Sequence, residues 1–83
     1  MIEALRIHVT GIVQGVGFRP FVYRLAKRFQ VSGWVLNAAD GVTIHAEGES
    51  DLLDRFVLSI SNDAPAAANV REIELEEVPL EGF

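Results

Sequence analysis

The alternation of hydrophobic and polar residues marks two segments of the chain as strands. Between Ala4 and Val13, apolar residues occupy every second position near the middle of the segment, which is typical of a half-buried strand. The same period of two returns over Val42–Glu47. A shorter strand, Ser32–Asn37, is expected before it, since the turn Ala38–Gly41 ends in Asp-Gly, a strong hairpin signal.

Two other segments carry their apolar residues at helical spacing. The first begins with Pro20, whose missing N–H costs nothing in the first turn of a helix, and it ends near residues 29–30. The second has its apolar positions over Leu52–Ile60. Ser50 is expected to cap this helix, with Asp51 close to the positive end of the helix dipole.

The last predicted strand, Val70–Val78, has an imperfect pattern. Val70 and Ile73 are out of phase, so we expect an irregular or bulged stretch there. The segment before it, Asn62–Asn69, contains Pro65 and four alanines and is predicted to be a loop. The glutamates of the predicted strand Val70–Val78 are typical of a charged edge strand, which discourages pairing with other chains.

The predicted order of elements is β-α-β-β-α-β, the ferredoxin-like or split βαβ arrangement of the α/β (α+β) class. Each helix has one apolar stripe, so both are expected on one face of a four-stranded antiparallel sheet. Residues 1–83 then form a single domain. The other face of the sheet is expected to be more exposed and to carry Arg6, His8, Thr43, His45 and Glu47.

Composition narrows the class of protein. A chain of 83 residues with 49% hydrophobic residues has material for one small core. The absence of cysteine excludes a disulfide framework, a thiolate metal site and a cysteine nucleophile, and it fits a reducing cytosol. No apolar run approaches the roughly 20 residues of a membrane helix, and the amino terminus lacks a signal-peptide pattern. We therefore expect a soluble, cytoplasmic domain without a membrane partner.

The charge is unevenly distributed along the chain. A net charge of −5 argues against a nucleic-acid partner. Nevertheless, four of the seven basic residues lie within ten positions: Arg19, Arg24, Lys27 and Arg28. A local positive site on an acidic body suits a small anion better than a polymer.

A glycine-containing segment, Gln14–Gly17, joins the first strand to the first helix. Two glycines let backbone amides curl inward into an anion nest, to which the helix amino terminus adds positive charge. Arg19 follows at the start of the helix, where a guanidinium can bind two phosphate oxygens. On spacing alone, an ordinary turn with a surface arginine explains the same residues. The pattern matches neither a Walker loop nor a dinucleotide-binding loop.

Two motifs make the chain resemble a known family. Gly11–Arg19 matches the acylphosphatase signature G-x-V-Q-G-V-x-F-R at every fixed position. A second block of that family is present as Gly33–Asn37, followed by Asp40-Gly41. The chain thus resembles the acylphosphatase family over essentially its whole length, and the resemblance agrees with the predicted order of elements.

The resemblance implies a hydrolase of acyl phosphates that needs neither metal nor cofactor. Its catalytic residues are Arg19, which binds the phosphoryl group, and Asn37, which positions the attacking water. The implied phosphate-binding residues are Val13, Gln14, Gly15, Val16, Gly17, Phe18 and Arg19.

Some residues depart from the stand-alone enzymes of this family. Leu36 replaces a basic or polar residue, and Arg19–Ala26 looks like the amino-terminal domain of the carbamoyltransferase that matures nickel–iron hydrogenases (HypF type). This implies carbamoyl phosphate as substrate and downstream domains of a longer protein as partners, with residues 79–83 as the start of a linker. A catalytically silent binding or regulatory module remains the alternative, because fold alone does not determine function.

Overall fold

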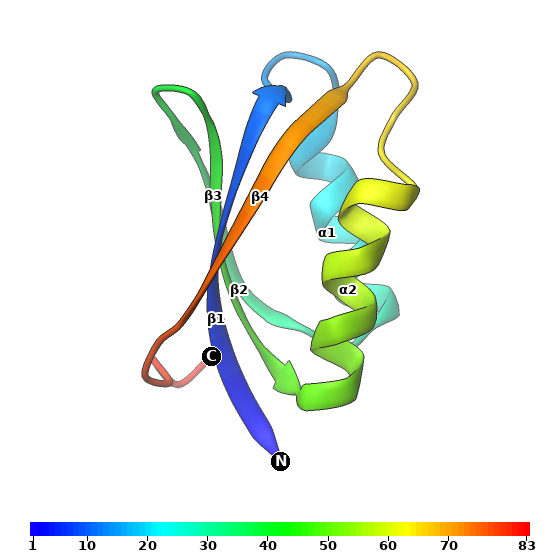
Figure 1. Cartoon of the computed structure of the whole chain (residues 1–83). Coiled ribbons are helices and arrows are strands. Elements are labelled where there is room, and N and C mark those ends of the chain that lie inside the picture. Colours follow the sequence, from blue (N-terminus) through cyan, green and yellow to red (C-terminus); the bar gives the residue numbers. More distant parts are fainter.

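Four strands and two helices follow one another in the predicted order in the computed structural model, which describes all 83 residues (Figure 1). The two helices lie side by side on one face of the sheet, as their single apolar stripes predict. The elements are β1 (Ile2–Ile12), α1 (Phe18–Arg28), β2 (Ser32–Ala38), β3 (Gly41–Glu49), α2 (Ser50–Asn62) and β4 (Asn69–Glu77).

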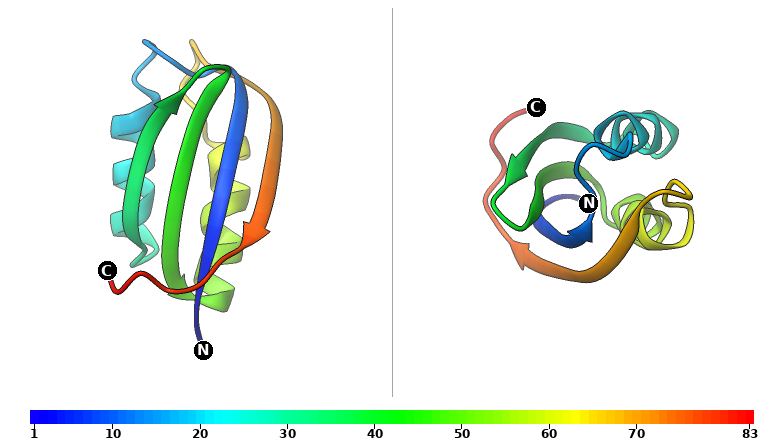
Figure 2. Two further views of the ribbon diagram at one scale, coloured as in Figure 1. Left: turned by 90° about the vertical axis from the view of Figure 1, so that its left-hand side faces the viewer. Right: turned by 90° about the horizontal axis from the view of Figure 1, so that it is seen from above.

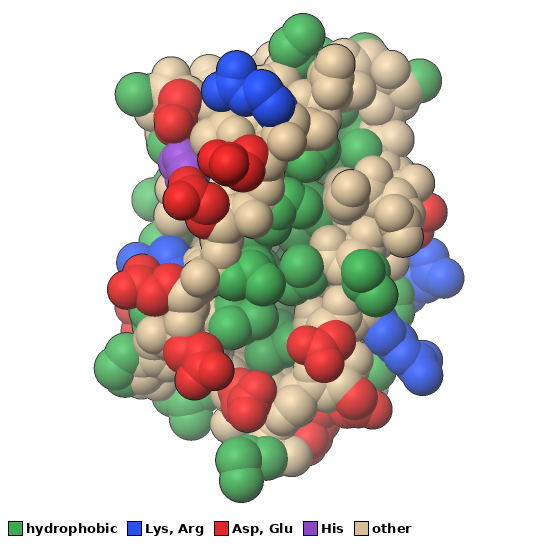
Figure 3. Space-filling model, in the orientation of Figure 1, with side chains coloured by type: hydrophobic (Ala, Val, Ile, Leu, Met, Phe, Trp, Pro, Cys, Tyr) green, Lys and Arg blue, Asp and Glu red, His purple; other side chains and the backbone are tan.

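The sheet is antiparallel throughout, with the strand order β2-β3-β1-β4 (Figure 2). β1 and β3 are therefore central, and β2 and β4 are the edges. The acidic strand β4 lies at an edge, as predicted, and Figure 3 shows carboxylates gathered along this side of the molecule. Its charges oppose pairing with a strand of another chain.

The core lies between the sheet and the helices. The facing pairs Val9–Val42 and Ile7–Ile44 of the central strands are buried beneath the helices. Burial of each such side chain contributes about 1.5–3 kcal/mol relative to exposure. The helices supply the remaining large core residues, namely Phe18, Phe21, Val22 and Leu25 from α1 and Leu53, Phe56 and Ile60 from α2. Neither helix has the length and apolar character needed to cross a bilayer.

The start of α2 differs from the prediction. Ser50 is the first residue of the helix, so Glu49 occupies the N-cap position and no side chain caps the helix. The reason is that β3 continues to Glu49, which pairs with Ile2. The Ser50 hydroxyl instead donates a hydrogen bond of 3.0 Å to the carbonyl of Met1.

The predicted irregularity of β4 is confirmed as a bulge against β1. Thr10 pairs with Glu72, whereas the next residue, Gly11, pairs with Val70. Arg71 is therefore the extra residue on β4. Val70 and Ile73 pair with Gly11 and Val9, which lie two residues apart on β1 and so face the same side. The extra residue therefore lets Val70 and Ile73 face the same side although they are three positions apart.

The sheet face opposite the helices is less exposed than predicted. His45 and Glu47 were expected to be exposed, but they are only 1% and 4% exposed. The residues after β4 fold back across this face, and the red carboxy-terminal segment of Figure 2 runs over the strands. The backbone N–H of Val78 begins this return with a hydrogen bond of 3.2 Å to the carbonyl of Ala4.

Candidate active site

The loop between β1 and α1 is shaped by two glycines. Gly15 and Gly17 have φ angles of 71° and 78°, in the left-handed region that favours glycine. A Cβ atom at either position would meet no heavy atom within 4 Å. Backbone conformation, and not crowding, therefore requires glycine here. Gly17 also occupies the N-cap position of α1, where no side chain caps the helix.

Apolar side chains hold this loop on the core. Val13 and Phe18, at its two ends, are each 1% exposed. Val16, in the middle, packs partly buried against the core cluster. The exposed residues between them, Gln14, Gly15 and Gly17, form the outer surface of the loop. Val16 and Phe18 thus anchor the loop on the hydrophobic core.

The backbone amides of this loop are free of internal partners. Outside the helices and strands, none of the backbone hydrogen bonds has a donor between Val13 and Arg19. The first N–H groups of a helix have no acceptor within that helix, and they carry its partial positive charge. The loop and the first turn of α1 therefore present several unpaired donors to an anion.

Arg19 lies in the first turn of α1 and is exposed. It belongs to none of the ion pairs of the structure, although the chain has 12 acidic residues. Its guanidinium is therefore free to bind an anion beside the loop amides.

Asn37 lies near the end of β2, on the same side of the sheet as α1. It pairs with Val42, which in turn pairs with the buried Val9. Directly paired residues of a sheet point to the same face, so Asn37 projects from the face that carries the helices. No hydrogen bond joins Asn37 to Arg19, and neither side chain has a hydrogen-bond partner in the protein.

The β2–β3 hairpin and the β1–α1 loop lie at one end of the sheet (Figure 1). This follows from the register, since Thr10 near the end of β1 pairs with Gly41, the first residue after the turn. Asn37 and the loop therefore share one end and one face of the domain. A shallow depression between loop and hairpin is lined by Gly11, Ile12, Val13, Gln14, Ala39, Asp40 and Gly41.

The Gln14 side chain crosses from the loop to the hairpin. Its Nε2 atom donates hydrogen bonds of 2.5 Å to the carbonyl of Ala38 and 2.7 Å to the carbonyl of Gly41. The sequence places Gln14 in the phosphate-binding loop but does not reveal this contact. The one available signal is a long amide side chain inside a loop of glycines and apolar residues.

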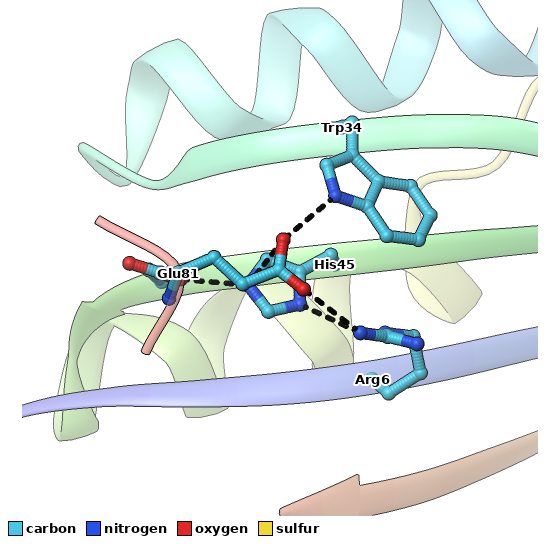
Figure 4. A network of polar contacts seen from close by, with 5 residues as sticks. Arg6, Trp34, His45 and Glu81 are labelled. Atoms are coloured by element: carbon cyan, nitrogen blue, oxygen red, sulfur yellow. Dashed lines mark hydrogen bonds and ion pairs between the residues drawn. The ribbon is translucent and has the colours of Figure 1, made fainter. Parts of the chain in front are cut away.

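A second polar network lies on the opposite face of the sheet (Figure 4). The Glu81 carboxylate accepts hydrogen bonds from Trp34 at 3.2 Å and from Arg6 at 3.3 Å. Beneath it, His45 Nε2 lies 2.7 Å from Glu47. The backbone N–H of Glu81, and secondly His45, hold the pKa of Glu47 below its ordinary value. This network lies across the sheet from Asn37 and is therefore separate from the candidate site.

His8 also lies on the face opposite the helices. Its Nε2 is 2.8 Å from Asp40, and its Nδ1 is 3.0 Å from the hydroxyl of Thr43. Both histidines thus have polar partners within the sheet, and the sheet separates them from Asn37. Both histidines lie on the sheet face on which the sequence places them.

Fold and loop together define a class of protein: a two-layer ferredoxin-like domain whose first strand ends in a glycine loop of unpaired amides. The family model "Acylphosphatase" matches residues 5–83. The chain belongs to the acylphosphatase family, whose members hydrolyse acyl phosphates.

Relatives of two kinds are similar to the chain. The acylphosphatase of Thermotoga maritima is 49% identical over 82 residues, which cover 98% of this chain and 90% of that protein. The carbamoyltransferase HypF2 of Cupriavidus necator is 47% identical over 95% of this chain, but the match covers only 10% of that protein.

Solved structures give the same two groups. A full-length HypF in a phosphate- and nucleotide-bound form matches with a TM-score of 0.96 and 37% identity, covering 100% of this chain and 11% of that one. The acylphosphatase of Bacillus subtilis matches with a TM-score of 0.90 and 43% identity, covering 99% of this chain and 91% of that one. These matches confirm the predicted fold and family.

Proposed function

We propose that this domain hydrolyses carbamoyl phosphate as the first step of a carbamoyl transfer, with Arg19 and Asn37 as its catalytic residues. The amides of the loop from Val13 to Arg19 and the guanidinium of Arg19 hold the phosphoryl group. The single observation that carries this assignment is that these amides and this guanidinium are unpaired at one end of the sheet. Asn37 shares that end and the face that bears the helices.

The proposed reaction requires positioning more than a strong nucleophile. An acyl phosphate already has a good leaving group, and phosphoryl transfer depends mainly on alignment and on stabilising charge on the equatorial oxygens. Water, held by the carboxamide of Asn37, forms the new O–P bond while the P–O bond to the acyl group breaks. The products are phosphate and the acyl carboxylate, which is carbamate in this case, and the proton of the water passes to phosphate or solvent.

Two observations support carbamoyl phosphate as the substrate. The segment Arg19–Ala26 departs from the stand-alone enzymes and looks like the corresponding segment of the hydrogenase-maturation carbamoyltransferases. In addition, the whole chain superposes on a small part of a full-length HypF with a TM-score of 0.96. On this proposal the domain works in the cytoplasm, and residues 79–83 lead towards downstream domains. Those domains use the carbamate to make the cyanide ligands of nickel–iron hydrogenases.

A general acylphosphatase is the second candidate. The 49% identity to the Thermotoga maritima enzyme, over 90% of its length, favours this function. Both candidates use the same site and differ only in the preferred acyl group. A catalytically silent module is the third, and it conflicts with the presence of both Arg19 and Asn37.

Phosphate release distinguishes these functions. The purified chain is assayed with carbamoyl phosphate, acetyl phosphate and benzoyl phosphate, beside the variants Arg19→Ala and Arg24→Ala. Arg24 is the matched control, because it is exposed on the same helix and belongs to no ion pair. We expect kcat/KM to be highest for carbamoyl phosphate and to fall by about 10²–10³-fold in Arg19→Ala only. Equal kcat/KM for all three substrates favours the general enzyme, and no turnover of any of them favours the silent module.

A further inference from the structure

We propose that Gln14 is a positioning residue, whose side chain fixes the end of the β2–β3 hairpin, and with it Asn37, relative to the phosphate loop. The inference rests on the proposed function, in which the loop holds the phosphoryl group and Asn37 holds the water. Those two parts of the site belong to different elements, and hydrolysis requires them to keep one relative position.

The hydrogen bonds of Gln14 connect the two parts directly. Both protons of its amide nitrogen are used, one for the carbonyl of Ala38 and one for that of Gly41. Ala38 directly follows Asn37, and it pairs with Gly41 as the last pair of the β2–β3 ladder. The carboxamide therefore holds both strands at the mouth of the turn.

No other polar side chain of the loop makes such a link. Gln14 and Ala38 are 24 residues apart in the chain, and the path between them runs through all of α1 and most of β2. β2 is an edge strand, supported on one side only, by β3. Without the contact, the end of the hairpin is tied to the loop only through β1 and β3. A misplacement of about 1 Å at a reacting group can cost about 10²-fold in rate, so a direct link matters for turnover.

Gln14→Glu tests the link without changing the size of the side chain. An ionised carboxylate cannot donate to the two carbonyls and is repelled by them, whereas a protonated carboxyl can donate one hydrogen bond. We expect kcat at neutral pH to fall by roughly 10-fold to 100-fold in Gln14→Glu, whose new carboxylate also repels phosphate and raises KM. KM and inhibition by phosphate should change by less than about 3-fold in the uncharged variant Gln14→Met, which lacks the same hydrogen bonds. Relative to the unmodified protein, kcat should partly recover as the pH falls towards the ordinary glutamate pKa of about 4.3.

Two further variants exclude a purely structural explanation. Gln14→Met keeps the length but has no donor, so its kcat should be low at every pH, without recovery in acid. Gln30→Glu changes the only other glutamine, which is exposed and has no polar side-chain contact, and it should leave kcat unchanged. Thermal unfolding of each variant shows whether the fold is intact. If kcat of folded Gln14→Glu and Gln14→Met equals that of the unmodified protein, the inference is overturned.

A double-mutant cycle with Asn37→Ala separates this inference from the proposed function. If Gln14 acts through Asn37, then Gln14→Glu should lower kcat by less than about 2-fold once Asn37 is already alanine. Independent, multiplicative effects would overturn the positioning role of Gln14 and leave the proposed function intact. Full activity of Asn37→Ala alone would instead overturn the water-positioning role on which the inference rests.

Discussion

The indole N–H of Trp34 donates a hydrogen bond of 3.2 Å to the carboxylate of Glu81, a residue 47 positions further along the chain. The same indole stacks on His45 with ring centroids 5.6 Å apart, and Phe83 contacts the histidine ring at 5.8 Å. The residues after β4 are thus held on the sheet by specific contacts. They shield the buried polar groups beneath them from water.

Replacement of Glu81 by alanine should lower the free energy of unfolding by about 1 kcal/mol, because the indole N–H and the Arg6 guanidinium lose a shared acceptor. Trp34 is the only tryptophan, so its fluorescence follows urea unfolding directly. Glu77→Ala is the control, since Glu77 is exposed and its side chain has no polar contact. The turnover of acyl phosphate should not change, because this network lies across the sheet from Asn37. An equal loss of stability in the control would contradict the role of Glu81.

The stability of the domain in acid should depend on Glu47. The Glu81 N–H, followed by His45, holds the pKa of Glu47 below its ordinary value of 4.5. The folded state therefore binds the proton less readily than the unfolded state. The stabilisation is complete above pH 4.5 and is lost as the pH falls through the lower pKa of the folded state.

Urea unfolding at a series of pH values below 5 measures this dependence. Glu47→Gln removes the titrating group, so its free energy of unfolding should fall less steeply with decreasing pH than that of the unmodified protein. Glu3→Gln removes one exposed carboxylate that has no hydrogen bond, and it controls for net charge. Identical slopes in Glu47→Gln and the unmodified protein would show that this carboxylate is not linked to folding.

Much of the fold is predictable because its signals are local. The period of two in β1 and β3, the helical spacing of α1 and α2 and the Asp40-Gly41 turn depend on neighbouring residues only. Even the bulge in β4 is visible in advance, because Val70 and Ile73 cannot share one face of a regular strand. The loop is predictable for the same reason, since its glycines and Arg19 are adjacent in the chain.

The return of the carboxy-terminal residues over the sheet is not predictable in this way. Val78–Phe83 shows no hydrophobic period, and Pro79 and Gly82 argue against a regular strand. Its position depends on contacts with residues such as Arg6, which is 75 positions away from Glu81. The burial of His45 follows from that segment. The contact of Gln14 with the hairpin is hidden for a similar reason, since it depends on the three-dimensional position of two carbonyls.

Gly17→Ala should impair phosphate binding more than it impairs folding. The φ angle of 78° costs an alanine about 1–2 kcal/mol, and the added Cβ itself meets no atom within 4 Å. Relief of that strain would turn the amides of the loop and of the first turn of α1 away from the phosphoryl group. Gly82→Ala is a matched control, with a φ of 94° and equally free space, but it lies outside the loop. Inhibition by inorganic phosphate and urea unfolding should be measured for both variants. Equal phosphate inhibition in the two would contradict this role of the loop.

Asn37→Ala should separate turnover from binding. The side chain is exposed and has no partner in the protein, so its removal should change the free energy of unfolding by less than about 0.5 kcal/mol. We expect kcat to fall by roughly 10²-fold, because the attacking water loses its fixed position. Inhibition by phosphate should be unchanged, since the loop amides and Arg19 remain.

The neighbouring residue supplies the control for this variant. Leu36 is also exposed, but it pairs with Thr43 and therefore projects from the sheet face opposite Asn37. Leu36→Ala should retain the kcat of the unmodified protein with every acyl phosphate. If both variants lose turnover to the same extent, the cause lies in the stability of the end of β2, and the carboxamide of Asn37 has no separate role in holding water. A loss confined to Asn37→Ala, without a change in phosphate inhibition, assigns the effect to the step in which water attacks.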